Sequence, residues 1–493
     1  MRRLLILVLL LGGLARLGAA QEAPYLPYYS KDTARVFQLA VAHRTAVQSH
    51  FVLPKTGNSE YREHYREVVR EASQDVYNSI RHSALLDPVV EPYVQQVFAR
   101  ILQANPQLPA GAKLVLSRSP EANAHAVGNS TVMLNIGLLL RLENESQLAF
   151  ILCHELAHMS CHHTEKRLHE RLTTLHSKEM KRDFRRIINS EYNISSQIKA
   201  LALGFSLNHN YHSRRFEKQA DSLGYVLLTR TNFDPAQAYR ALQLLDKINE
   251  PETAEGASLS TYFSCAEFPK TFEGMAARPK SIFTVKTEET VLQTTDTLKT
   301  HPDCVKRMRY LHTLAQGKVA DGVQPASPEF ARIRYVSRLE VIQSWFDFDC
   351  YDHALFEALL LLPQQPRNPY LHSMVLLSLY ELRQHLLAHA YGEVVSNISE
   401  HNPARFNDLL YALHGLRNED FLGLVACFTQ AVTTDAAAPA DEYALAARYT
   451  AHALSSDDRA AADFKAQYQQ QYAGGRFGKL LFPEPAKARA TRR

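Results

Sequence analysis

The feature that most constrains this chain is the motif HELAH at residues 154–158, which ends an apolar run that begins at Leu148. Residues four apart on a helix lie on one face, about 6 Å apart along the axis. His154 and His158 can therefore each direct a ring nitrogen at one metal ion, while Glu155 lies beside that face, where it can act as a general base. Because two histidines and a glutamate are costly to bury unless their polar atoms are satisfied, the pattern predicts a zinc site on a buried helix.

A zinc site of this kind needs at least a third protein ligand. Glu217 and Asp221 lie four apart on a second helical stretch with apolar and small neighbours. We expect Glu217 to bind the metal and Asp221 to hydrogen-bond the free nitrogen of a ligating histidine. His162 lies a further turn along the first helix, too far to join a tetrahedral site. The predicted ligands are therefore His154, His158 and Glu217, which would hold one zinc ion per chain.

The second helical stretch reads SRRFEKQAD over residues 213–221. Together with HELAH it resembles the HtpX-like and CaaX prenyl endopeptidase-like zinc metallopeptidases, a gluzincin family with the signature H-E-x-x-H followed by S-R-x-x-E-x-x-A-D. The transmembrane helices of those two branches are not found in this sequence. The chain therefore resembles the soluble periplasmic branch of the family, which includes the protease that assists outer-membrane barrel assembly. The second signature is matched in full by Ser213, Arg214, Glu217, Ala220 and Asp221.

Two further segments carry the same resemblance. His301 and Arg307 look like the closing H-P-x-x-x-x-R element of the family, and the resemblance implies a role near the site. We expect His301 to stabilise the oxyanion, with Arg307, Tyr211 and His212 as the other candidates. The other segment is similar to the edge strand of the family and could bind a substrate as an added strand. Its residues are Asn123, Ala124, His125, Ala126 and Val127.

The resemblance implies a zinc-dependent endopeptidase that cleaves peptide bonds of exported or misassembled proteins. Glu155 would assist the attack of a zinc-bound water and later protonate the leaving amine. One alternative is a non-catalytic periplasmic adaptor or chaperone with structural zinc, and another is a zinc hydrolase that does not act on peptides. Glu155 argues against the adaptor, because a structural zinc site needs no base.

The N-terminal residues predict export from the cytoplasm. Arg2 and Arg3 precede an apolar run over 4–14, and small residues follow at 18–20, as in a secretory signal peptide. The run is too short to span a bilayer of about 30 Å, so we expect a periplasmic or secreted protein with no integral membrane segment in the mature chain. The 55 Lys and Arg nearly balance the 51 Asp and Glu, which argues against a nucleic-acid partner.

The six cysteines are too sparse for a disulfide framework in a chain of this length. Cys153 and Cys161 would lie about 12 Å apart along one helix, too far for a bridge. We expect Cys265 and Cys304 to be the pair. The two remaining cysteines, Cys350 and Cys427, are then expected to be buried thiols.

The expected fold is α+β and mainly helical: a zincin-type metallopeptidase body with a small β-sheet, followed by a helical C-terminal domain. Proline-punctuated helical pairs beyond Phe330 favour a tetratricopeptide-like array, with an irregular bundle as the alternative. We expect this region to bind a protein partner. Residues 165–186 are highly charged, which predicts a solvated projecting helix, or a lid or partner-binding arm.

The domain boundaries follow from these patterns and from the Gly, Pro and Ser cluster near 317–328. The expected parts are a signal peptide over 1–20, an N-terminal helical segment over 21–86, a zinc metallopeptidase domain over 87–316 with a loop or insertion at 250–300, a helical tetratricopeptide-like domain over 328–473, and a basic disordered tail over 474–493.

Overall fold

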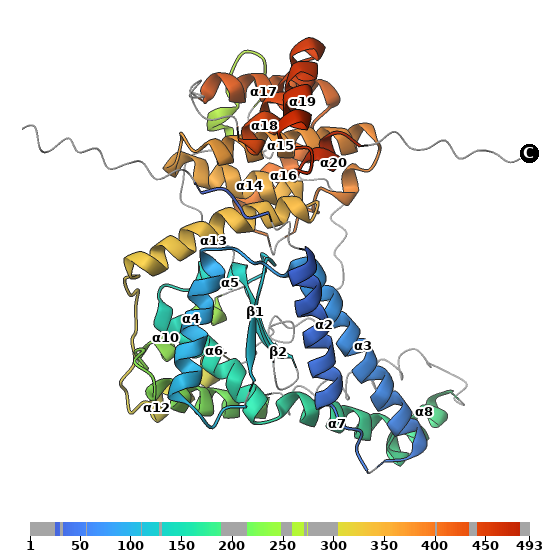
Figure 1. Ribbon diagram of the computed structural model, residues 1–493, viewed down its shortest axis with the longest axis vertical. Coiled ribbons are helices and arrows are strands. Elements are labelled where there is room, and N and C mark those ends of the chain that lie inside the picture. Colours follow the sequence, from blue (N-terminus) through green and yellow to red (C-terminus); the bar gives the residue numbers. More distant parts are fainter. Residues whose placement is uncertain are drawn as a thin grey trace, which may run out of the picture.

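The protein is mainly helical with one small sheet in the computed structural model, which confirms the α+β fold class (Figure 1). Among the described helices, none is both long enough and apolar enough to cross a membrane. The expected signal peptide and most of the expected loop at 250–300 lie outside the described residues. The structure describes residues 25–29, 33–55, 57–109, 111–127, 131–188, 214–247, 259–270, 274, 304–399, 402–432 and 441–483.

The sheet has three strands in the order β1-β3-β2. The central strand, β3 (Thr131–Asn135), runs parallel to β1 (Lys113–Ser117) and antiparallel to β2 (Ala124–Val127). β2 is thus an outer strand of this sheet, as the sequence predicts for this segment. Helix α6 (Glu145–Ser160), which carries the HELAH motif, packs against β2 and β3.

Helices cover both faces of the sheet, since side chains alternate between the faces along each strand. Val115 and Met133 pack against the helical pair α2–α3, while Leu114, Val132 and Leu134 pack in the core that contains α4 and α6. Figure 1 shows α2 and α3 on one side of the strands and α4 and α6 on the other. The helices of this N-terminal body are α2 Thr33–His50, α3 Ser59–Ser83, α4 Val90–Ala104, α5 Ile136–Arg141, α6, α7 His163–Leu175, α8 Lys178–Ile188, an unlabelled helix over 214–229, α10 Gln237–Asp246 and α12 Cys304–Leu314.

Helix α13 (Pro328–Asp347) joins the N-terminal body to the C-terminal helices and belongs to both cores. Phe330, Ile333 and Val336 pack into the core of the body. Further along the same helix, Leu339 and Ile342 pack into the core of the C-terminal part. The two parts therefore share a core helix, although the sequence places a domain boundary just before it.

The C-terminal part consists of helices that follow one another in pairs above α13 (Figure 1). The tetratricopeptide-like arrangement stays a prediction. Helix α14 packs against α15, and α18 packs against both α15 and α19. The helices are α14 Tyr351–Leu361, α15 Pro369–Leu387, α16 Ala404–His414, α17 Asn418–Ala431, α18 Glu442–Leu454, α19 Asp458–Gln471 and α20 Gly478–Leu481.

The prediction of a disordered basic tail over 474–493 is wrong for residues 474–483. Phe477 and Leu481 are buried, and the largely covered side chain of Arg476 donates to the carbonyl oxygens of Pro27 and Tyr28. The basic composition of this segment conceals apolar side chains that are sufficient to pack on the C-terminal core. Residues 484–493 lie outside the described part of the chain.

The predicted disulfide is also wrong. Cys265 is bonded to Cys427, 162 residues away, whereas Cys304 is buried on α12 and takes no part in this bond. The physical reason is the placement of residues 259–270, whose Phe263 stacks on Phe428 in the C-terminal core. Cys265 therefore meets a cysteine of α17, although Cys304 is much nearer in the sequence.

A buried cluster of two acids and a tyrosine connects the N-terminal segment to α13. The Tyr25 hydroxyl lies 2.5 Å from Asp87 Oδ2 and 2.5 Å from Glu340 Oε1, and the Tyr28 amide donates to the same Glu340 oxygen. A hydroxyl carries one proton, so Tyr25 can donate to only one of the two carboxyl groups. Burial raises the pKa of Glu340 to about 7, so this carboxyl group binds a proton more readily than an exposed glutamate does.

The pKa of Glu340 predicts a pH dependence of stability. Because this carboxyl group binds its proton more tightly in the folded than in the unfolded state, its contribution is fully present below about pH 4.5 and is lost as the pH rises through about 7. Glu340→Gln should remove this loss, which amounts to at most about 3 kcal/mol. Urea denaturation at pH 5 and pH 8 measures the effect, with Glu329→Gln, an exposed glutamate of the same helix, as the control.

Candidate metal centre

Two helices bring the predicted ligands together. Helix α6 begins at the N-cap Asn144, whose side chain accepts from two backbone amides, and its motif residues are buried. The helix over 214–229 lies close against it at Gly224, where an added Cβ would be 3.0 Å from the Cα of His154. Glycine therefore permits an approach that lets Glu217 and Asp221 reach the histidines of α6.

The predicted ligands meet in a buried cluster. The Nε2 atoms of His154 and His158 are 3.0 Å apart, and Glu217 places one oxygen 3.4 Å from each of them. The three residues form a candidate metal-binding group with all three side chains buried. Separations of 3.0–3.4 Å suit three ligands that each lie about 2 Å from one ion, as zinc requires.

Glu155 lies buried beside this group. Its Oε1 has no hydrogen-bond partner among the described residues. A buried polar atom without a partner is unusual in a folded protein and indicates a position where a further polar group belongs. The donor set and Glu155 together fit a zinc ion with a water beside it.

Neighbouring side chains fix the tautomers of both histidines. His154 Nδ1 lies 3.0 Å from Asp221 Oδ1, so its proton faces the carboxylate and the Nε2 lone pair faces the cluster. His158 Nδ1 lies 2.9 Å from His163 Nδ1, and His163 Nε2 lies 3.1 Å from the side-chain Oε1 of Gln219. His163 therefore donates to Gln219 and accepts from His158, which leaves the His158 Nε2 lone pair for the metal.

Residues 88–315 match the family model of peptidase family M48. The chain contains an M48 peptidase domain. This confirms the resemblance to zinc metallopeptidases. The chain is also 26% identical over 161 residues to the mitochondrial metalloendopeptidase OMA1 of Schizosaccharomyces pombe, and 25% identical over 150 residues to the putative beta-barrel assembly-enhancing protease of Vibrio cholerae.

These similarities are confined to part of each protein. They cover 31% and 30% of this chain, and 43% and 31% of the two relatives. The M48 match contains His154, Glu155, His158, Glu217 and Asp221. The match ends before α13, so the family model does not include the C-terminal helices.

The buried cluster of His154, His158 and Glu217 is called the M48 centre below. Arg307 of α12 balances its charge. Its guanidinium makes two 2.7 Å hydrogen bonds to the carboxylate of Asp221, and its Nη1 lies 3.1 Å from Glu217 Oε2. Because the carboxylates of Asp221 and Glu217 occupy its guanidinium, Arg307 positions the metal ligand Glu217. This role differs from the oxyanion contact that the sequence analysis considered for Arg307. The other oxyanion candidates, His301, Tyr211 and His212, lie outside the described residues, as does Ser213.

The charges of the centre are strongly coupled. Burial alone would lower the pKa of His154, but Asp221 and Glu217 outweigh it and raise this pKa to about 9. Burial would raise the pKa of Asp221, yet Arg307 and His154 bring it down to about 2. Because a histidine must be deprotonated to bind a metal, metal binding competes with protonation of His154.

The predicted substrate strand lies beside the motif helix. Ala124 is buried, His125 is exposed and Ala126 and Val127 are half-buried, while Asn123 immediately precedes the strand. α6 packs against β2, so this outer strand runs beside the helix that carries the HELAH motif. The assignment of these residues to substrate binding stays a prediction.

Sequence reasoning missed the role of His163. Its buried ring stacks on Phe216 and supports His158, but the only signal in the sequence is its place directly after His162.

His163→Leu should weaken zinc affinity about 10- to 100-fold, because the proton on His158 Nδ1 loses its acceptor. His163→Asn, which keeps an acceptor near Nδ1, should restore most of the affinity. Equilibrium zinc competition measures both, and equal affinities for the two variants would contradict the assignment.

Removal of Arg307 should destabilise the M48 domain. Arg307→Met leaves two buried carboxylates without their cation, which typically costs about 3–5 kcal/mol. Arg309→Met changes an exposed arginine of the same helix and should cost little. Urea denaturation of the two metal-free variants compares them directly, and similar midpoints would show that Arg307 is dispensable for folding.

Proposed function

We propose that this chain is a zinc-dependent endopeptidase. The observation that carries the proposal is the convergence of His154, His158 and Glu217 in a buried cluster. Beside it lies Glu155, whose Oε1 has no hydrogen-bond partner in the described part of the chain. A structural zinc site is closed by four protein ligands, whereas a hydrolytic site has three and an adjacent base. The described residues of the cluster supply three ligands and a glutamate, which supports the hydrolytic alternative over an adaptor with structural zinc.

Each residue then has a distinct task. His154, His158 and Glu217 would hold the zinc, and bound zinc supplies a Lewis acid that activates water and polarises the peptide carbonyl. Glu155 removes a proton from the attacking water and returns it to the leaving amine. Asp221 keeps His154 in the ligating tautomer, and the expected oxyanion contact falls to His301.

The proposed substrates are exported or misassembled polypeptides. An extended segment could pair with β2 through its backbone, which would make binding tolerant of sequence. The name of the Vibrio cholerae relative connects it with beta-barrel assembly, which supports a substrate class of this kind. The C-terminal helices would recruit or position a protein partner.

We further propose that the protein acts in the periplasm or outside the cell. The signal-peptide pattern over 1–20 supports this location. The disulfide between Cys265 and Cys427 gives independent support, because such bonds persist mainly in oxidising compartments.

Glu155→Gln tests the proposed catalysis. The amide keeps the shape of the side chain but cannot accept a proton, so zinc content should be unchanged while cleavage of unfolded casein falls about 10²- to 10⁴-fold. Glu145→Gln makes the same change about 15 Å away on the same helix and should retain activity. A zinc-loaded wild-type chain that cleaves no polypeptide would favour the adaptor, and a fully active Glu155→Gln chain would assign the base elsewhere.

A further inference from the structure

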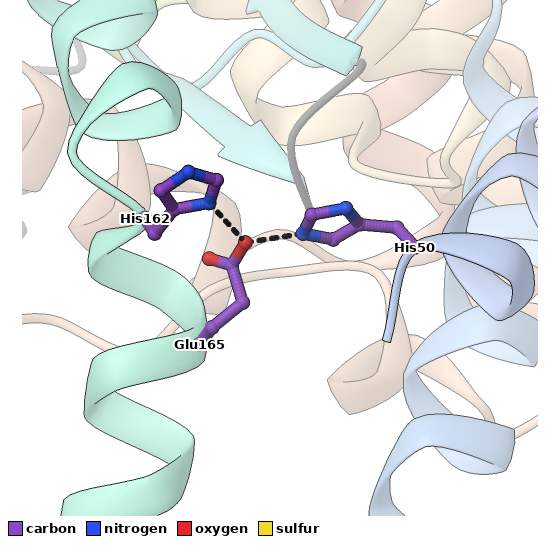
Figure 2. A group of neighbouring side chains, drawn as sticks. All are labelled: His50, His162 and Glu165. Atoms are coloured by element: carbon purple, nitrogen blue, oxygen red, sulfur yellow. Dashed lines mark hydrogen bonds and ion pairs between the residues drawn. The ribbon is translucent and has the colours of Figure 1, made fainter. Parts of the chain in front are cut away.

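A second group of metal-binding side chains lies where the end of α2 meets the start of α7. It consists of His50, His162 and Glu165, whose ligand atoms all lie within 4.8 Å of one another. Figure 2 shows the two imidazole rings on either side of the Glu165 carboxylate, with His50 on one helix and the other two residues on the facing segment. None of the three belongs to the M48 centre.

Both histidines approach the same carboxylate oxygen. His162 Nδ1 lies 3.0 Å from Glu165 Oε1, and His50 Nε2 contacts that oxygen from the other side. The imidazole rings are nearly parallel, with an angle of 8° between their planes. Although partial burial of Glu165 acts in the opposite direction, the two histidines lower its pKa and favour the charged carboxylate.

The backbone at His162 brings this group together. His162 has a φ of 53°, in the left-handed region, at the break between α6 and α7. This conformation is uncommon for residues other than glycine, although histidine, like asparagine and aspartate, adopts it more often than most. It separates α6 from α7. His162 and Glu165 lie three residues apart at the N-terminus of α7, and both side chains face His50 in Figure 2.

We propose that His50, His162 and Glu165 form a second binding site for a divalent transition-metal ion such as zinc. Two imidazoles and one carboxylate are ligands that zinc prefers, whereas magnesium and calcium prefer oxygen ligands alone. The three ligands leave a position for solvent, and His162 is 58% exposed, which makes the site accessible and exchangeable. Its metal should therefore bind more weakly than that of the buried M48 centre.

The position of the site gives a bound ion a structural consequence. His50 is the last residue of α2, whereas His162 lies two residues after the end of the motif helix and caps the start of α7. Apart from this group, the contact between the α2–α3 pair and α7 includes a small apolar cluster centred on Tyr61, Tyr65 and Leu172. A metal ion would cross-link the two segments at the turn that also carries His163, the residue that supports His158.

Zinc titration of the full-length Glu155→Gln chain tests the proposal, because this variant keeps every ligand of the M48 centre and should not degrade itself. After dialysis leaves one tightly held zinc, competition with a chromogenic chelator should reveal a second, weaker equivalent. His162→Asn tolerates the left-handed backbone and removes one ligand, and His50→Gln removes another. Each variant should lower the zinc affinity of the second site at least tenfold. Loss of a residue that only supports a ligand already costs a metal site this much.

His169→Gln is the matched control, because His169 also lies on α7 but contacts Tyr61 instead of the proposed site. It should leave the second equivalent unchanged, and magnesium should not compete with zinc. The two histidines can also donate hydrogen bonds to Glu165 without any metal. Absence of a second equivalent, or unchanged affinity in both His162→Asn and His50→Gln, would establish that metal-free arrangement and overturn the proposal. Because the readout is metal binding, it is separate from the test of proteolysis.

Discussion

The buried ion pair between Arg307 and Asp221 is the interaction on which the metal centre depends. It connects α12 to the helix over 214–229, and Asp221 in turn contacts His154 on α6. Arg307 also balances the charge of Glu217, so one guanidinium permits two carboxylates to lie in an apolar core. Such a network is favourable only when every charge is paired, which makes three helices from distant parts of the sequence mutually dependent.

The metal ligands were predictable because their spacing follows local geometry. Residues four apart share a helix face, so HELAH places His154 and His158 together whatever surrounds the helix. Glu217 was predictable because it lies four residues before Asp221 on a second helical stretch with apolar and small neighbours, a pattern that the family resemblance also supports. The support of His158 by His163 was not, since it depends on the left-handed turn at His162, which the identity of that residue does not signal.

Outside the motif, the sequence predicted the types of secondary structure better than the contacts between distant segments. The small sheet and the many helices follow from periodicity, and β2 was correctly placed at an edge. The pairing of Cys265 with Cys427 depends on which core residues 259–270 join, and nothing local decides this. The packing of Phe477 was hidden for a similar reason, because a few apolar residues in a basic segment resemble a disordered tail.

Helix α13 has a consequence for how this architecture can be recombined. Its first half completes the core of the M48-containing body and its second half completes the core of the C-terminal helices. A chimera joined near residue 320, where the composition resembles a linker, would take half of its core packing from a foreign helix. A workable junction lies after Asp347, in the turn before α14, so that α13 travels with the peptidase and the incoming module must fit the face that α13 presents.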